Sequence, residues 1–282
     1  MQEGVTAVII SFNGRLHPGE CADSLSGQVD HIVIVDNGSD DTSRLDLQRS
    51  AAGKDWEIIW LETNLGIAAA LNIGLTAAVR HGSRWMLTMD QDSVAAPDMV
   101  SALSQTLSAE PSAACASAAL PGINPGGSGT MLRYAITSGN MVRTDVAVAI
   151  GGYWEELFID GVDLDFSLRL RDAGHNIYRS PNAQIFHRLG DRASRIPFHS
   201  YHSPLRRYYI FRNYWALMGR HARRHPGFAA RLTASHLVQL VTIVIFGEQR
   251  WRSLAAIAQG CVDALHNRQG KFQSSPPKPA HS

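Results

Sequence analysis

Four short segments in the first 90 residues are made almost entirely of apolar residues, with helical or polar stretches between them: residues 6–12, 31–36, 57–61 and 85–89. Between the last two, Ile67, Leu71 and Leu75 recur every four residues, which predicts a helix over residues 66–81. Asn64 is placed to help cap this helix. Strands that are apolar without alternation are typical of a parallel sheet buried on both faces. The sequence therefore predicts an α/β fold with a mostly parallel sheet flanked by helices.

The rest of the chain continues this alternation and then changes character. Further elements are expected as helices at 97–108 and 163–173, and as strands at 113–119, just before 138–141 and at 183–187. Residues 121–129 are rich in Gly and Pro and are the strongest candidate for a mobile loop. From about residue 201 the sequence is helical and Arg-rich, and the tail from Phe272 has a disordered composition. We therefore expect an α/β domain at 1–200, a helical extension at 201–271 and a disordered tail at 272–282.

Composition narrows the class of protein further. With 282 residues and 45% hydrophobic content, the chain can bury a sizeable core. Its three cysteines are too few and too scattered for a disulfide framework or a zinc site, which favours a reduced, cytoplasmic setting. No signal-peptide pattern opens the sequence. The longest apolar run, residues 237–247, has 11 residues. Because a membrane span needs roughly 18, no spanning segment is expected.

The net charge of +1 conceals a strong asymmetry along the chain. Residues 1–187 carry 11 Lys and Arg against 22 Asp and Glu, whereas residues 188–252 carry 12 Arg against 2 acidic residues. The basic part has no nucleic-acid recognition motif, and over residues 204–213 its cations alternate with aromatic residues. A membrane face or a lipid-phosphate ligand fits this pattern at least as well. A solvated basic surface and, for residues 237–246, packing in a homodimer or a core helix remain alternatives.

Small polar or acidic residues follow each of the four apolar strands. They are Ser11 and Asn13, then Asp36, then Asn64 with Gly66, and finally Asp90 with Asp92. The carboxyl ends of parallel strands form one edge of the sheet, where ligands bind in open α/β folds. Asp90 and Asp92 would repel each other there unless a hard divalent cation with oxygen ligands lay between them, although simple strand-end capping is the alternative. The sequence lacks the glycine fingerprint of a dinucleotide site and the P-loop of a phosphotransferase.

The order of these motifs resembles that of the inverting family-2 glycosyltransferases of GT-A fold. In the first half the motifs are residues 6–13, 35–41 (VDNGSDD), 64–74 (NLGIAAALNIG) and 89–93 (MDQDS). In the second half, residues 158–169 (FIDGVDLDFSLR) stand where that family carries its acidic base motif, and residues 185–190 (IFHRLG) where it carries a distal His. The match covers about residues 5–215 and is most similar to the bacterial dTDP-rhamnosyltransferases of cell-surface polysaccharide assembly. It implies a Rossmann-like GT-A sheet followed by the Arg-rich helices.

The resemblance also implies a nucleotide-sugar site at the strand ends. Asp36 would accept a hydrogen bond from the pyrimidine ring of the donor. Asp92 would ligate Mg²⁺ or Mn²⁺ that bridges the diphosphate, and His187 would be a second metal or phosphate contact, with a structural hydrogen-bonding role as its alternative. The other implied donor-binding residues line the nucleotide and the sugar, and Gly66 would allow close approach of the backbone: Ser11, Asn13, Asn64, Gly66, Asn72, Asp90 and Gln91.

An inverting transfer needs one carboxylate to take the proton from the attacking acceptor hydroxyl. Asp160, Asp163 and Asp165 are the candidates. The family usually carries a Glu-Asp pair here, and alignment on residues 168–169 places that pair on Val162 and Asp163, so the Glu is missing. Asp163 opens a helix, whose dipole favours an ionised carboxylate. We therefore expect Asp163 to be the base, and the other two acids are accounted for as helix-capping residues.

Together these residues predict metal-dependent, inverting transfer of a sugar to a lipid-linked or saccharide acceptor. L-rhamnose from dTDP-rhamnose is favoured over the sugar of a UDP-linked donor. Nucleic acid is not expected as a partner, and a peripheral contact with the inner membrane face and a homodimer both remain open. One alternative is a nucleotidyltransferase that makes nucleotide sugars, for which residues 13–15 are a poor Gly-rich loop. Another is a non-catalytic sugar-nucleotide-binding module, which would have no need for a base.

Overall fold

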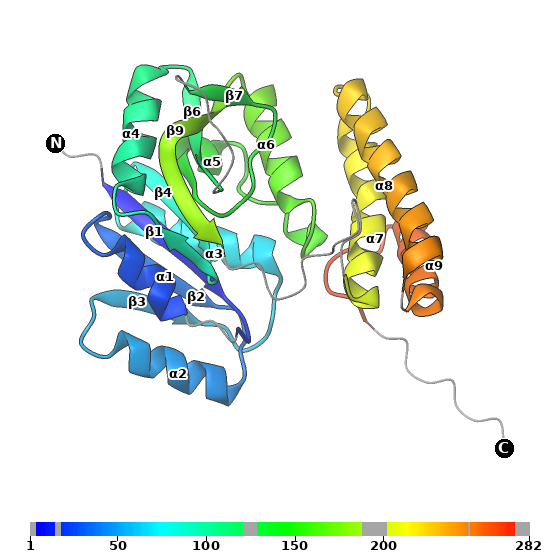
Figure 1. The fold of residues 1–282 in the computed structure, drawn as a ribbon, viewed down its shortest axis with the longest axis horizontal. Helices are drawn as coiled ribbons and strands as arrows, with labels where there is room; N and C mark the ends of the chain where they lie inside the picture. Colours follow the sequence, from blue (N-terminus) through cyan, green and yellow to red (C-terminus); the bar gives the residue numbers. More distant parts are fainter. Residues whose placement is uncertain (1–3, 15–17, 121–128, 188–201, 248, 274–282) are drawn as a thin grey trace.

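The computed structural model describes residues 4–14, 18–120, 129–187, 202–247 and 249–273. A mixed sheet of nine strands forms the centre of the larger part, with helices on both faces (Figure 1). Its strand order is β3-β2-β1-β4-β8-β6-β9-β5, and β7 pairs with β9. The Gly/Pro-rich segment expected at 121–129 lies almost wholly outside the described residues, as does the chain from 188 to 201.

The first four apolar segments form the parallel half of the sheet, as predicted. They are β1 (Val5–Ser11), β2 (His31–Asp36), β3 (Trp56–Trp60) and β4 (Trp85–Asp90). The register pairs Ser11 with Asp36 across β1 and β2, and Ile10 with Asp90 across β1 and β4. The four carboxyl ends therefore lie along one edge of the sheet, which confirms the expected convergence of the polar residues that follow them.

The other half of the sheet is more irregular than the sequence suggested. β8 (Asn140–Arg143) runs antiparallel between β4 and β6 (Ala113–Ala119), so the strand begins at Asn140 rather than ending before Ser138. β9 (Asn176–His187) is a 12-residue strand, of which only the last part was expected. Two short strands were missed, β5 (Ser93–Ala95) and β7 (Thr130–Leu132), both antiparallel to β9. Three residues carry too little periodicity for a strand to be recognised.

Two sets of helices bury the two faces of the sheet. The chain packs α1 (Pro18–Leu25), α2 (Asp41–Ala51) and α4 (Met99–Ala109) on one face. On the other it packs α3 (Ile67–Arg80), α5 (Thr144–Ala149) and α6 (Val162–Asp172). Successive residues of β1 serve the two cores in turn, with Ala7 and Ile9 in the first and Val8 and Ile10 in the second. Gly74 lets α3 approach the sheet, because a Cβ there would lie 2.1 Å from Val8 Cγ1.

Three long helices form the C-terminal layer beside α6 (Figure 1). They are α7 (Pro204–His221), α8 (Pro226–Phe246) and α9 (Arg250–Leu265), and Phe211, Ile243 and Ile257 form their shared core. Phe272 is ordered, which corrects the expected start of the tail: its N–H donates to Tyr209 Oη (2.8 Å) and its ring packs edge-on against Tyr208. The residues after 273 lie outside the described part.

By length and composition alone, α8 could cross a membrane, contrary to the expectation drawn from contiguous apolar runs. An 18-residue window of this helix has a mean hydropathy of 1.5, and 22% of that window is buried. The run of apolar residues is interrupted at Ser235 and His236, whereas an average over the whole window tolerates such breaks. Core helices of soluble proteins can have the same length and hydropathy. What distinguishes α8 is that it is this apolar while most of it is exposed.

Candidate active site

The ends of β1 and β2 are joined by hydrogen bonds through Asn13. Its backbone has a φ of 40°, its N–H donates to Ser39 Oγ (3.1 Å), and its side-chain oxygen accepts from the N–H of Asp40 (2.7 Å). Ser11, the last residue of β1, is buried, and its carbonyl accepts from the N–H of Asn37 (2.8 Å). Ser11 and Asn13 thus lie together at the predicted edge, and Asn13 holds the loop after β2 in place.

Asp36 ends β2 and is only 1% exposed. Its Oδ1 accepts from the N–H of Ser39 (3.1 Å) and lies 3.3 Å from Arg44 Nε on α2. Arg44 also donates to the carbonyl of Leu61 and stacks over the ring of Trp60 at 5.7 Å. Asp36 is therefore a buried carboxylate already held by one cation, and this partner was not identified from the sequence.

Asn64 and Gly66 order the segment that leads into α3. Asn64 Oδ1 accepts from the N–H of Gly66 (2.8 Å), and Asn37 bonds to both Asn64 Oδ1 (3.3 Å) and the N–H of Leu65 (2.9 Å). Gly66, not Asn64, is the N-cap of α3, with a φ of 91°. A Cβ at Gly66 would lie 2.6 Å from the carbonyl oxygen of Phe158. The close approach that this glycine permits is thus to Phe158, the first residue of the acidic motif.

Asn72 lies in the middle of α3 and uses its amide on another part of the chain. Its Oδ1 accepts from the N–H of Tyr153 (2.7 Å), while its Nδ2 donates to the Tyr153 carbonyl (2.9 Å) and to Glu155 Oε1 (2.7 Å). All three bonds fix the turn after α5. The described contacts of Asn72 therefore hold the approach to the acidic motif, not the strand ends.

Asp90, Gln91 and Asp92 follow one another at the end of β4. The N–H of Asp90 donates to Ser138 Oγ (3.1 Å). Gln91 bonds in both directions with the backbone of Phe12, donating to its carbonyl and accepting from its N–H at 3.1 Å each, so it ties β4 to the end of β1. The backbone of His187 pairs with Ser93, which brings the end of β9 beside Asp92; the side chain of His187 lies outside what the structure describes.

The donor set at the end of β4 fits a hard divalent cation. Asp90 and Asp92 are one residue apart and half-buried. Their charges are felt at Cys21, whose pKa is raised first by burial and then by both carboxylates. Carboxylate oxygens from two nearby acidic residues are the ligands that Mg²⁺ or Mn²⁺ prefers.

A second group of potential metal ligands joins the ends of α6 and α7. Asp172, His221 and His225 each offer an atom within 4.8 Å of the others. The Asp172 carboxylate, however, lies 2.9 Å from His225 Nε2 and 3.6 Å from Arg224, so a cation there would compete with an existing guanidinium. These contacts account for the cluster as a link between two helices.

The acidic motif has an unusual backbone. Phe158 and Asp160 both have a φ of 64°, and Gly161, with a φ of 82°, is the N-cap of α6. Asp160 is held by Arg206 of α7, with Nη2 at 2.9 Å and Nε at 3.2 Å from its oxygens. The structure therefore accounts for Asp160 as an ion-pair partner rather than as a helix cap.

Asp163 lies in the first turn of α6, half-buried, and its Oδ1 accepts from the N–H of Leu164 (2.9 Å). Burial raises the pKa of Asp163 above its ordinary value, and the nearby Asp160 carboxylate adds to this shift. The helix dipole was expected to favour the ionised carboxylate and so to lower this pKa. The shift of the pKa is in the opposite direction. A raised pKa is the property of carboxylates that accept protons near neutral pH.

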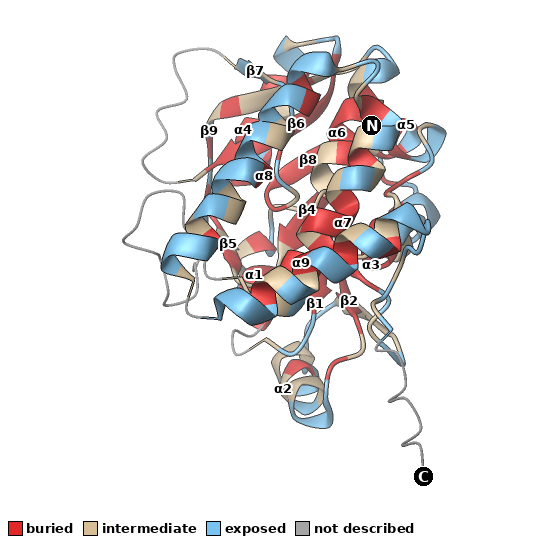
Figure 2. Cartoon of the chain, turned by 90° about the vertical axis from the view of Figure 1, so that its right-hand side faces the viewer, coloured by how far each residue is buried: buried red, intermediate tan, exposed pale blue. Residues whose placement is uncertain are grey.

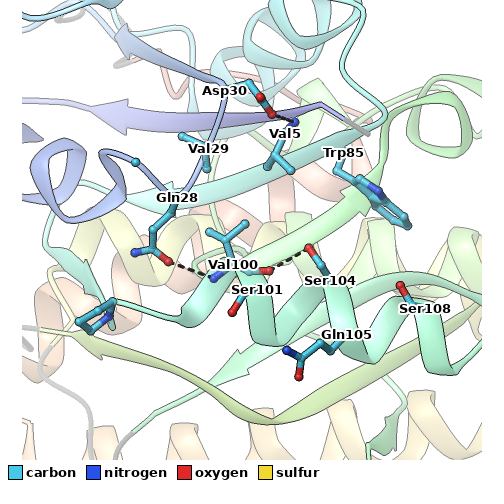
Figure 3. Close-up of a pocket in the computed structure, with 12 residues that line it drawn as sticks. Val5, Gln28, Val29, Asp30, Trp85, Val100, Ser101, Ser104, Gln105 and Ser108 are labelled. Carbon is cyan, nitrogen blue, oxygen red and sulfur yellow. Dashed lines mark hydrogen bonds between the residues drawn. The ribbon is translucent and has the colours of Figure 1, made fainter. Parts of the chain in front are cut away.

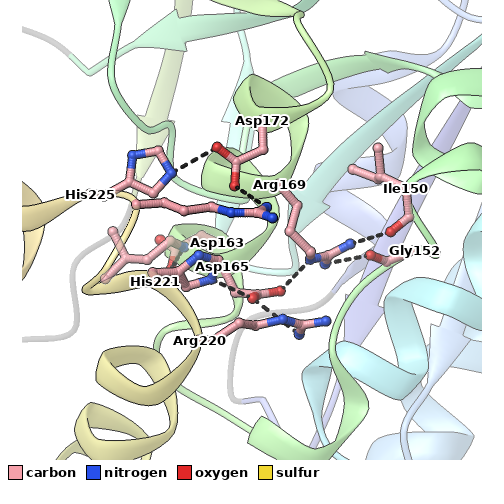
Figure 4. A network of polar contacts seen from close by, with 11 residues as sticks. Ile150, Gly152, Asp163, Asp165, Arg169, Asp172, Arg220, His221 and His225 are labelled. Carbon is pink, nitrogen blue, oxygen red and sulfur yellow. Dashed lines mark hydrogen bonds and ion pairs between the residues drawn. The ribbon is translucent and has the colours of Figure 1, made fainter.

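Asp165 is fully buried in an ionic network between α6 and α7 (Figure 4). Its oxygens lie 2.7 Å from Arg169 Nε, 2.8 Å from His221 Nε2 and 3.3 Å from Arg220 Nη1. Burial alone would raise the pKa of Asp165, but the bond with His221 and the charge of Arg169 hold it below its ordinary value. Asp165 is thus a structural acid that fixes α6, not a helix cap.

Side chains of helix α7 bind the backbone of the acidic motif, which was not predicted from the sequence. Asn213 Nδ2 lies 2.7–2.9 Å from the carbonyls of Leu157, Ile159 and Asp160. Arg212 donates to the Leu157 carbonyl at 3.0 Å, and both side chains are 2% exposed. The alternating cations and aromatics of residues 204–213 had suggested a membrane face. One feature of the sequence could have indicated this contact: Arg212 and Asn213 are adjacent polar residues between aromatic ones, and polar side chains that are buried in a helix need hydrogen-bond partners.

A sizeable cavity lies elsewhere in the described part of the chain (Figure 3). It has a volume of about 620 Å³ and is lined by Val5, Trp85, Gln28 and residues of α4. Val5 and Trp85 are the first residues of β1 and β4, so this cavity opens at the amino edge of the sheet. Ligands of open α/β sheets bind at the carboxyl edge, where the acidic residues are.

Comparison with known proteins agrees with this geometry. The model of the family "Glycosyl transferase family 2" matches residues 6–155, which contain the strand ends and the Asp90–Asp92 pair. The chain belongs to glycosyl transferase family 2. Its fold is GT-A-like, with the Arg-rich helices following the sheet, as the sequence predicted.

Individual relatives and solved structures show how far the similarity extends. The dTDP-rhamnosyl transferase RfbF of Shigella flexneri is 27% identical over 245 residues, covering 77% of this chain and 81% of that protein. S. aureus TarS in complex with UDP-GlcNAc has a TM-score of 0.63 at 14% identity, covering 93% of this chain and 81% of that one. The mannosyltransferase PcManGT of Pyrobaculum calidifontis with GDP-Man and Mn²⁺ has a TM-score of 0.56 at 16% identity, over 93% and 80%. These two structures share the fold.

Proposed function

We propose that this family-2 glycosyltransferase transfers L-rhamnose from dTDP-rhamnose, with inversion, to a lipid-linked or saccharide acceptor. The observation that carries the proposal is the position of Asp163: a half-buried carboxylate with a raised pKa in the first turn of α6, directly after the loop whose Phe158 contacts Gly66 at the entrance to α3. The choice of rhamnose is supported by the 27% identity to a dTDP-rhamnosyl transferase, and that of a nucleotide-linked sugar by neighbours bound to UDP-GlcNAc and GDP-Man.

On this proposal the strand ends bind the donor. Asp36 accepts from the pyrimidine N3–H, and its buried position makes the loss of that bond costly. Ser11 and Asn13 line the base on one side, and Asn64 and Gly66 on the other. Gln91 shapes this pocket through its two bonds to Phe12 and need not touch the donor itself.

Asp92 would hold the cation, with His187 as a further ligand, and Asp90 would face the ribose or the sugar. When bound, Mg²⁺ or Mn²⁺ supplies positive charge to the diphosphate that leaves. Solved relatives of this fold were crystallised with Mn²⁺.

Asp163 takes the proton from the acceptor hydroxyl as its oxygen attacks the anomeric carbon from the face opposite the nucleotide. The bond from the N–H of Leu164 fixes one carboxylate oxygen, so the other is available to the hydroxyl. Asp160 and Asp165 cannot easily share this role, because each is already ion-paired with arginines of α6 or α7.

Donor preference is tested by calorimetry of the full chain with dTDP, UDP and GDP, each with and without Mn²⁺. We expect the two pyrimidine nucleotides to bind more tightly than GDP, and only when Mn²⁺ is present. Release of dTDP from dTDP-rhamnose, compared with release of UDP from UDP-GlcNAc, then tests the sugar. Preference for GDP, or turnover of UDP-GlcNAc alone, would contradict the proposed donor.

The metal assignment has its own test. Asp92→Ala removes one oxygen ligand and should abolish the Mn²⁺ dependence of dTDP binding while the thermal unfolding curve stays close to that of the wild type. Asp98→Ala, at an exposed position before α4, is the matched control. If Asp92→Ala binds dTDP with unchanged Mn²⁺ dependence, the metal is held elsewhere.

A further inference from the structure

One face of α8 is apolar and exposed. Its members recur at helical spacings of one, three and four, and we call them the α8 stripe: Leu237, Val238, Val241, Val244 and Ile245. Leu237, Val241 and Ile245 are 58%, 56% and 58% exposed. Trp251, at the start of α9, is 74% exposed. Figure 2 views the molecule from this side and shows α8 largely exposed along its length.

The opposite face of α8 already packs against the protein. His236 and Ile243 are buried, His236 lies against Phe211 and Tyr214, and Tyr214 Oη lies 2.9 Å from Thr233 Oγ1. The α8 stripe is therefore not needed for the fold of the three helices. A helix with apolar residues all round is normally covered on every side, so a partner is missing from the exposed face.

Exposed arginines precede and follow the α8 stripe in the chain. Arg223 precedes α8, Arg231 lies seven residues before Val238 on the same side of the helix, and Arg250 and Arg252 flank Trp251. All four are exposed, and none forms an ion pair with another described residue. Arg250 stacks on the Trp251 ring at 5.9 Å. Apolar side chains with adjacent Trp and Arg are typical of helices that lie in the interface of a bilayer with anionic lipids.

We propose that the α8 stripe and Trp251 dock on an anionic lipid bilayer, with α8 parallel to the membrane plane. The stripe enters the boundary between headgroups and acyl chains, and the four arginines contact lipid phosphates. This inference does not depend on the sugar donor, because it concerns a surface formed only by the C-terminal helices. It would bring the catalytic part close to an acceptor that is itself anchored in lipid.

A second copy of the chain is a less suitable occupant of the same face. A symmetric dimer contact places the same patch on both partners, so Arg231, Arg250 and Arg252 would approach their own copies or one another. Like charges at an interface oppose association, whereas anionic headgroups neutralise them. The charge of this face therefore selects the lipid surface.

The test is flotation of the full chain with vesicles of phosphatidylcholine alone and of phosphatidylcholine with phosphatidylglycerol. We expect binding to the anionic vesicles at low salt and its loss toward 1 M NaCl, where the Debye length falls to about 3 Å. Val241→Glu/Ile245→Glu should weaken binding at least about tenfold, since two aliphatic side chains no longer enter the bilayer. Arg250→Gln/Arg252→Gln should weaken it by about fivefold for each arginine removed.

Val79→Glu/Val148→Glu is the matched control, because these valines are 50% and 51% exposed on α3 and α5. It should bind vesicles like the wild type. Three results would overturn the proposal. The first is no flotation at low salt, or an equal loss of binding in Val241→Glu/Ile245→Glu and in the control Val79→Glu/Val148→Glu. The second is a stable dimer in light scattering that Val241→Glu/Ile245→Glu dissociates. The third is retention of the protein in vesicles after a carbonate wash, which would make α8 a spanning helix.

Discussion

The two halves of the proposed active site are built by different means. The donor half stands on four adjacent parallel strands, and its polar residues follow those strands in sequence, so their positions are set by backbone pairing. The acidic half is a short loop with two left-handed non-glycine residues, Phe158 and Asp160. That loop is held mainly by side chains of α7, about 50 residues later in the chain.

The contrast indicates that α7 supports the acidic half of the proposed site. Asn213 and Arg206 fix the loop and Asp160 directly, and Phe158 stacks on Tyr209 with 5.1 Å between ring centroids. Damage to α7 should therefore affect the base and leave the donor pocket intact. Damage to the strand ends should do the reverse. The predictions below separate the two halves on this principle.

Asp163→Asn should have the largest effect on catalysis. It keeps the shape of the side chain but cannot accept a proton, so transfer should fall by about 10²–10⁴-fold. Affinity for dTDP with Mn²⁺ should stay within about twofold of the wild type, because the donor half is untouched. The measurements are dTDP release from dTDP-rhamnose with a polyprenyl-diphosphate-linked saccharide acceptor, and calorimetry with dTDP.

Asp160→Asn and Asp165→Asn are the controls for this assignment. Both should retain far more activity than Asp163→Asn while they remain folded. Asp165→Asn should lower the free energy of unfolding by about 3–5 kcal/mol, because Arg169 loses its buried partner. If Asp163→Asn remains active and either control fails while folded, the base is the other acid.

Asn213→Ala should separate the two halves most clearly. It leaves the carbonyls of Leu157, Ile159 and Asp160 without this donor, which should cost about 1–3 kcal/mol of unfolding free energy. A displaced loop moves Asp163, and a shift of about 1 Å can cost up to 10²-fold in rate. We expect a 10–100-fold loss of transfer with unchanged dTDP affinity, by the same assays.

Asn176→Ala is the matched control, since Asn176, at the start of β9 and outside the acidic motif, is a partly exposed amide whose Nδ2 donates to Ser112 Oγ (2.9 Å). It should change neither rate nor affinity. A parallel loss of dTDP affinity in Asn213→Ala would show that α7 supports both halves, and the contrast between them would fail.

The same contrast explains what could be predicted from the sequence. Apolar strands and the polar residues after them are local patterns, so the meeting of the strand ends at one edge could be predicted from the sequence, whereas Asp163 was proposed from the family motif. Two contacts could not be predicted in this way: Asn213 bonds to the acidic loop, and Arg44 pairs with Asp36. No local sequence pattern connects the residues of either pair. Asn72 shows the limit of a local motif. The motif suggested that Asn72 binds the donor, yet its described bonds go to Tyr153 and Glu155.

Asp36→Ala should affect the donor half only. The loss of a buried acceptor should weaken dTDP and UDP binding alike, by about 1–3 kcal/mol, if Asp36 contacts the pyrimidine edge that both share. Turnover at saturating donor should change much less than in Asp163→Asn. Asp40→Ala, which removes only the exposed N-cap of α2, should leave affinity unchanged. Equal affinity of Asp36→Ala and the wild type for both nucleotides would remove Asp36 from the site.

The smallest effect concerns pH and tests the environment of Asp163. Burial raises the pKa of Asp163, so the protonated form persists to higher pH in the folded protein than in a free carboxylic acid. A base must be ionised, so the transfer rate should fall as the pH drops through this raised pKa, above the ordinary range of Asp. Since folding favours the protonated form, the same group should contribute less to stability as the pH rises through its pKa.

A rate profile at saturating donor measures the acid limb, and Asp163→Asn is the control. The residual rate of this variant should lack that limb, because the amide does not titrate. An unchanged limb in Asp163→Asn would assign the titration to the donor half and remove the support that burial gives to Asp163 as the base.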